Sequence, residues 1–131
     1  MSCQMFKAVG NLVYSNDPYK LIVSVDDEIG KYYRSLVPKY LAVRKPMYPT
    51  HISVVRKQIP VNLSVWNKYQ GQEIAFDYDN HIYNDEVYYW LNAYSKQLED
   101  IRLELGLENT SRFTRSNDGR HKFHITIGNT K

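Results

Sequence analysis

The sequence predicts a single α+β domain over residues 1–131, with about six strands and two or three helices. The chain has the length of one domain. Its composition, 43% apolar and 24% charged, is typical of a globular protein. Extended segments with apolar alternation are interrupted by short helical patterns. No stretch resembles a membrane span or a signal peptide, so we expect a cytoplasmic protein that binds no membrane.

The strands are predicted where apolar residues alternate between turn signals. The cluster from Ser15 to Pro18 predicts one turn, and Asn84 with Asp85 predicts a hairpin turn. Polar residues, with a glycine at Gly119, predict a loop over residues 109–121. The extended segments are residues 4–14, 19–25, 50–57, 73–83, 86–94 and 122–128.

Capping residues mark two helices. Asp26 or Asp27 is a suitable N-cap for a helix that ends near Leu36, because Pro38 lies inside the apolar pattern. Ser95 is a suitable N-cap for a helix from Lys96 to about Leu105, and Gly106 closes it. Residues 62–70 are predicted to form a third, short helix.

Charge is unevenly distributed along the chain. Residues 1–60 carry nine basic and four acidic side chains, and residues 110–131 carry five and one. Residues 61–109 reverse this balance, with three basic and nine acidic side chains. If the two ends meet in the fold, they form a positive face that favours an anionic ligand. Cys3 is the only cysteine, which excludes an internal disulfide.

Two short segments repeat one pattern of histidine, apolar residue and hydroxyl residue. They are His51-Ile52-Ser53 and His124-Ile125-Thr126, and each lies in a predicted strand. Period-2 geometry places His51 beside Ser53 on one face, and His124 beside Thr126 on one face. An imidazole next to a hydroxyl can act as an acid or base and donate to a phosphate oxygen. One copy is common in strands, but two copies in one small domain favour a functional site.

These motifs resemble those of the 2H phosphoesterases, a family named for two His-x-Thr/Ser motifs. The resemblance implies a bilobal α+β fold in which two antiparallel sheets form a central cleft, with helices outside. It also implies a phosphodiesterase that needs no metal or other cofactor and acts on RNA-type linkages. His51, Ser53, His124 and Thr126 are then the catalytic residues. By analogy with the family, His51 is the base and His124 the acid, and the two hydroxyls bind the phosphate.

Three further stretches resemble the anti-CBASS nucleases of tailed phages, small 2H enzymes that destroy the cyclic oligonucleotide signals of bacterial immunity. The stretches are residues 6–12, 32–40 and 120–129. The resemblance implies a cyclic di- or trinucleotide substrate and the cytoplasm of a host cell, and we infer no obligate protein partner from it. Two alternatives stay open: an RNA 2′,3′-cyclic or 2′,5′-oligonucleotide phosphodiesterase of the same superfamily, and a non-catalytic nucleic-acid-binding module.

Aromatic and basic residues outside the motifs are candidates for substrate binding. Flat rings can stack nucleobases, and arginines can bind phosphates. The candidates are Tyr14, Tyr48, Trp66, Arg112, Arg115 and Arg120. The hairpin residues Tyr88, Tyr89, Trp90 and Tyr94 are expected to belong mostly to the core, with one face available for stacking. No metal site is expected, because no pair of histidines or cysteines has a ligand spacing.

Overall fold

The computed structural model describes residues 5–107 and 123–131 of the chain. Seven antiparallel strands and two α-helices make up the described part, with two short 3₁₀ turns. The strands are β1 (Met5–Ser15), β2 (Lys20–Ser24), β3 (His51–Val55), β4 (Glu73–Asp79), β5 (Tyr83–Asn84), β6 (Tyr88–Tyr94) and β7 (Phe123–Asn129). The helices are α1 (Asp27–Ser35) and α2 (Lys96–Glu104), and the 3₁₀ turns are η1 (Lys39–Leu41) and η2 (Leu63–Val65).

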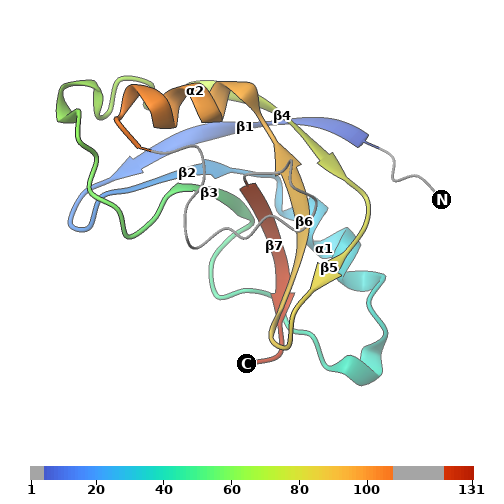
Figure 1. Ribbon diagram of the computed structural model, residues 1–131. Helices are drawn as coiled ribbons and strands as arrows, with labels where there is room; N and C mark the ends of the chain where they lie inside the picture. Colours follow the sequence, from blue (N-terminus) through green and yellow to red (C-terminus); the bar gives the residue numbers. More distant parts are fainter. Residues whose placement is uncertain (1–4, 108–122) are drawn as a thin grey trace.

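The strands form one sheet that closes on itself. Their order is β4-β1-β2-β3-β7-β6-β5, and β4 also pairs with β6. Asp77 lies opposite Tyr94, and Tyr78 lies opposite Ala93. Six strands therefore form a closed antiparallel barrel, and β5 extends the edge of β6. Figure 1 shows α2 at the top of the view and α1 to the right of centre, at about mid-height.

The predicted bilobal fold, with two sheets around a central cleft and helices outside, is wrong. The described strands belong to one sheet, and the β4–β6 pairing joins what would have been two separate lobes. Residues 62–70, predicted as a helix, form only the 3₁₀ turn η2 and irregular turns. The protein is therefore mostly β in its described part, because the chain between β3 and β4 adds no α-helix.

The apolar core lies inside the barrel. Each of the six barrel strands contributes buried side chains to this cluster. The shared inner face includes Leu12, Leu21, Ile52, Ile74, Leu91 and Ile125. From α2, Leu98, Ile101 and Leu105 join this cluster. Alternating polar residues of the strands consequently point outward, as period-2 geometry requires.

The two helices begin at the predicted capping residues. The side chain of Asp26 accepts a hydrogen bond from the Glu28 amide, and that of Ser95 accepts one from the Leu98 amide. Gly106 follows α2 in the left-handed region with φ +81°, which glycine adopts without steric cost. From α2, the buried Arg102 donates from Nη1 to the Val54 carbonyl at 2.7 Å. This hydrogen bond ties α2 to the end of β3.

Replacing Leu91 with alanine is expected to lower the free energy of unfolding by ~2–5 kcal/mol, because the substitution leaves a cavity inside the barrel. Leu91 is fully buried, whereas Leu103 on α2 is 55% exposed and serves as the matched control. Urea denaturation of both variants measures the difference. We expect Leu103→Ala to stay within about 0.5 kcal/mol of wild type. Equal losses in the two variants would contradict the placement of β6 inside the core.

Candidate functional site

The first His-x-Ser segment occupies β3, and its residues alternate between the two faces of the sheet. Ile52 and Val54 are buried in the barrel. His51 and Ser53 are half-buried and point to the other face. The alternation follows from the period of an extended strand, in which successive side chains point in opposite directions. The apolar residues hold the strand in the core, and the histidine and serine remain accessible on its outer face.

The second segment occupies β7 and repeats this arrangement. Phe123, Ile125 and Ile127 are buried in the core, and His124 and Thr126 are half-buried on the opposite face. Both segments therefore present imidazole and hydroxyl groups on one side of a strand whose other side is apolar. This is the alternation that the sequence predicted for the two segments.

The register between β3 and β7 places all four residues together. The two strands pair antiparallel, with Ile52 opposite Ile125. In an antiparallel pair a step along one strand matches a backward step along the other, so His51 faces Thr126 and Ser53 faces His124. We call this outer surface of β3 and β7 the motif face.

The two histidines occupy diagonal corners of the motif face. Facing residues of an antiparallel pair have Cβ atoms about 4.5–5.5 Å apart, and diagonal neighbours lie roughly 7–8 Å apart. The two hydroxyl residues, Ser53 and Thr126, occupy the other corners. A group the size of a phosphate can therefore lie between two imidazoles and contact two hydroxyls.

The neighbouring strand β6 extends the motif face with one aromatic and one amide residue. On β6, Trp90 lies opposite Thr126 and Asn92 lies opposite His124. The ring centroids of Trp90 and His124 are 5.1 Å apart, with the planes tilted by 55°. Trp90 Nε1 donates to Asn92 Oδ1 at 3.0 Å. Trp90 therefore forms a wall of the site beside His124.

Sequence reasoning did not single out Trp90 among the aromatic residues of its hairpin. The burial pattern along β6 separates them, because Tyr89, Leu91 and Ala93 are buried on the core face. Trp90 alternates with these residues and is half-buried on the motif face. The sequence alternation shows that Trp90 and Tyr89 lie on opposite faces of β6. The pairing of β6 with β7 is needed to show that the Trp90 face is the one that carries His124.

The imidazole of His51 has a defined hydrogen-bond partner. Its Nδ1 lies 2.8 Å from the carbonyl oxygen of Pro49. A carbonyl oxygen only accepts, so Nδ1 must carry the hydrogen. In the neutral ring the lone pair is then on Nε2, which is the nitrogen free to accept a proton from a substrate.

Thr50, the residue before His51, is fixed by the chain segment that begins α1. Its amide donates to Asp27 Oδ1 at 2.7 Å, and its carbonyl accepts from the Val25 amide at 3.1 Å. The hydrogen bond from the Thr50 amide, with a second from the Thr50 side chain, lowers the pKa of Asp27 below its ordinary value of 3.8. Asp27 is therefore ionised at neutral pH and contacts the residue that precedes the motif.

The predicted substrate-binding aromatics lie in three different surroundings. Tyr14 is buried on the core face of β1, and burial raises its pKa. Trp66 packs edge-on against Tyr14 and Tyr19 and donates to Asn16, so its contacts lie at the turn between β1 and β2. Tyr48 is exposed, with Lys20 Nζ 5.1 Å from its ring centroid. None of these contacts joins the motif face.

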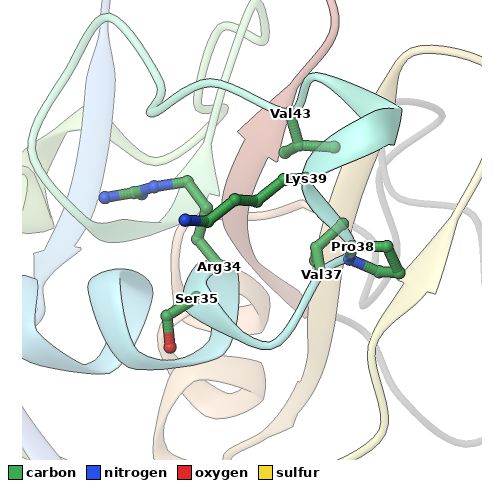
Figure 2. A pocket seen from close by; sticks show the side chains of 6 residues that line it. All are labelled: Arg34, Ser35, Val37, Pro38, Lys39 and Val43. Carbon is green, nitrogen blue, oxygen red and sulfur yellow. The ribbon is translucent and has the colours of Figure 1, made fainter.

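The predicted arginines Arg112, Arg115 and Arg120 lie outside the described residues. His81, which lacks a hydroxyl partner in sequence, is exposed, and its ring packs against Tyr83. A pocket of about 250 Å³ at the end of α1, shown in Figure 2, is lined by Arg34, Ser35, Val37, Pro38, Lys39 and Val43. Arg34 also donates to the Ile127 carbonyl at 2.9 Å, which ties α1 to β7. The lining of this cavity contains none of the four motif residues.

No protein-family profile, curated protein or solved structure matches the chain. Over residues 5–107 and 123–131, no helix is long and apolar enough to cross a membrane. Within the same ranges, no three histidine, cysteine, aspartate or glutamate side chains gather as a metal site would require.

Replacing Asp27 with asparagine is expected to change how stability depends on pH. The native pKa of Asp27 lies below its ordinary value, so its ionised form stabilises the fold above about pH 4. That contribution is lost as pH falls through the lowered pKa. Wild type should therefore be more stable than Asp27→Asn at pH 7, and the gap should close in acid. Urea denaturation from pH 7 to 2.5 checks this. A gap that is constant or widens in acid would contradict the Asp27–Thr50 interaction.

Proposed function

We propose that the protein is a metal-independent phosphodiesterase that cleaves RNA-type 3′,5′ linkages with His51 and His124 as its acid–base pair. The observation that carries this proposal is the cross-strand arrangement on the motif face, with two imidazoles on one diagonal and two hydroxyls on the other. In-line displacement at phosphorus needs a base at the attacking oxygen and an acid at the leaving oxygen, on opposite sides of the phosphate. Diagonal histidines satisfy that requirement.

The proposed reaction begins with the substrate's own 2′-hydroxyl. Neutral His51 takes the proton from this hydroxyl at Nε2 while the 2′-oxygen attacks phosphorus. The bond from phosphorus to the 5′-oxygen breaks, and protonated His124 gives its proton to that oxygen. The products are a 2′,3′-cyclic phosphate and a 5′-hydroxyl. Ser53 and Thr126 donate hydrogen bonds to the non-bridging oxygens, where negative charge increases.

The hydrogen bond of His51 supports its role as the base. His51 donates from Nδ1 to the Pro49 carbonyl, which leaves Nε2 as the accepting nitrogen of the neutral ring. His124 lies 5.1 Å from the centroid of the Trp90 ring. By analogy with the 2H phosphoesterases, His124 is the imidazole that is protonated in this step. We therefore assign His51 as the base and His124 as the acid.

The proposed substrate is a cyclic oligonucleotide second messenger, and its destruction would counteract CBASS immunity in the host cytoplasm. The resemblance of residues 6–12, 32–40 and 120–129 to phage anti-CBASS nucleases supports this choice. Two of these stretches contribute to the strands β1 and β7. Trp90 is the aromatic side chain beside His124 that a base of such a ligand would contact, and its ring also stacks with Tyr83 at a centroid distance of 6.4 Å.

The alternatives make different predictions. A linear 2′,5′-oligonucleotide or a 2′,3′-cyclic phosphate offers the same phosphate to the same residues, so a substrate panel separates these enzymes by rate. A non-catalytic nucleic-acid-binding module would bind the panel without releasing product. The arrangement of the motif face favours an enzyme, because binding alone does not require two imidazoles on one diagonal.

Replacing His51 or His124 with alanine is expected to lower the rate of cyclic dinucleotide cleavage by roughly 10²–10⁴-fold, since each removes a proton-transfer group. His81→Ala is the matched control, because His81 is exposed and its ring packs on Tyr83. Circular dichroism establishes that the variants are folded, and chromatography of products measures the rates. The assignment is wrong if either motif variant keeps the wild-type rate.

The substrate's 2′-hydroxyl is expected to be essential. A 3′,5′-linked cyclic dinucleotide should be opened in excess EDTA, with a first product that ends in a 2′,3′-cyclic phosphate. The 2′-deoxy ring should bind and stay intact, because it lacks the nucleophile whose proximity lowers the barrier. Chromatography and the mass of the first product check both outcomes. A first product with a 5′-phosphate, or loss of activity in EDTA with rescue by a divalent ion, would indicate attack by water.

A further inference from the structure

One peptide group connects the first turn of α1 with the imidazole of His51. This is the peptide between Pro49 and Thr50. Its N–H, on Thr50, donates to Asp27 Oδ1 at 2.7 Å. Its carbonyl, on Pro49, lies 2.8 Å from His51 Nδ1. The N–H and the C=O of a trans peptide point in opposite directions, so the carboxylate and the imidazole lie on opposite sides of a planar group.

The two hydrogen bonds of this peptide strengthen each other. A carboxylate acceptor makes a stronger hydrogen bond than a neutral acceptor. When the Asp27 carboxylate accepts the hydrogen bond from the Thr50 N–H, it polarises the peptide group. The negative partial charge on the carbonyl oxygen of that peptide then increases. The Pro49 oxygen consequently becomes a better acceptor for the Nδ1 hydrogen of His51. Asp27 thus acts on His51 without touching it.

The surrounding structure places Asp27 for this contact. Asp26, not Asp27, caps α1, so the Asp27 carboxylate is available to Thr50. Gly30 faces the Thr50 side chain, and a Cβ atom at this position would lie 2.7 Å from Thr50 Oγ1. Glycine at this position therefore allows α1 to approach Thr50, the residue before the motif, this closely. Val25 fixes the other side of Thr50 by donating to its carbonyl at 3.1 Å.

Charges around Asp27 favour its ionised form. Lys45 and Arg34 both act on the carboxylate through their positive charge, in addition to the two hydrogen bonds from Thr50. Asp27 therefore presents a carboxylate, not a carboxylic acid, to the peptide at neutral pH.

We propose that Asp27 is a positioning residue for His51, acting through the Pro49–Thr50 peptide to hold the imidazole as the Nδ1–H tautomer with Nε2 free. The consequence for catalysis rests on the proposed function, in which Nε2 of His51 takes the proton from the 2′-hydroxyl. The effect on the tautomer does not depend on that function. The arrangement resembles a carboxylate–histidine pair in which a peptide group stands between the two side chains.

The test compares Asp27→Ala with Glu28→Ala. Both variants remove one negative charge from the first turn of α1, but only Asp27 contacts Thr50. Nitrogen-15 NMR of His51 near pH 9, where an ordinary imidazole is neutral, reports which ring nitrogen carries the hydrogen. We expect the Nδ1–H form to dominate in wild type and Glu28→Ala, and a mixture that includes Nε2–H in Asp27→Ala. Steady-state rates should show kcat lower by roughly tenfold in Asp27→Ala alone, with KM changed by less than twofold.

Asp27→Asn is the conservative variant, because its amide oxygen can still accept from the Thr50 amide. Its population of the Nδ1–H tautomer should lie between those of wild type and Asp27→Ala, because a neutral amide is a weaker acceptor than a carboxylate, and it should recover part of the kcat lost in Asp27→Ala. An Nδ1–H form that is equally populated in Asp27→Ala and wild type would overturn the proposal. So would a tautomer mixture in Asp27→Asn like that in Asp27→Ala. If wild type cleaves no phosphodiester, the proposed function fails, and the tautomer measurement still decides whether Asp27 positions His51.

Discussion

The pairing of β3 with β7 is the interaction on which the rest of the site depends. Ile52 and Ile125 face each other inside the barrel and are both fully buried, so the two strands are fixed in register by the core. A slip of one residue would turn one of the two apolar sets outward, at the cost of burying polar side chains. The same register brings His51 opposite Thr126 and Ser53 opposite His124. Packing on one face of the sheet thus determines the arrangement of functional groups on the other.

The two histidines share a face but differ in what holds them. His51 donates to the carbonyl of Pro49, in the segment just before β3. The next residue, Thr50, donates its amide hydrogen to Asp27 on α1. His124 lies beside Trp90 on the neighbouring strand β6. The proposed acid–base pair needs one neutral and one protonated imidazole. Arg102 from α2 and Arg34 from α1 donate to the carbonyls of Val54 and Ile127, which secures the two motif strands at their ends.

The sequence predicted local structure better than it predicted pairing. Alternation identified the faces of His51 and His124, and capping residues identified both helices, because these signals depend on neighbours in the chain. The closure of the sheet depends on the pairing of β4 with β6. No local sequence pattern encodes this pairing between separate segments, so the predicted bilobal fold was wrong. Asp26 and Asp27 were equivalent N-cap candidates in the sequence. Asp26 caps the helix and Asp27 binds Thr50. This difference could not be predicted without knowing where the start of β3 lies relative to α1. Tyr14 was a candidate for base stacking because it is aromatic, but its strand turns it into the core.

The register of β3 against β7 is the central claim, and cross-strand nuclear Overhauser effects between backbone protons measure it directly. In isotope-labelled protein, we expect contacts that pair Ile52 with Ile125, and, one step to either side, His51 with Thr126 and Ser53 with His124. Contacts that pair Ile52 with His124 or with Thr126 would contradict the account, because a shift of one residue places a histidine of one strand opposite an apolar residue of the other. The motif face would then not exist.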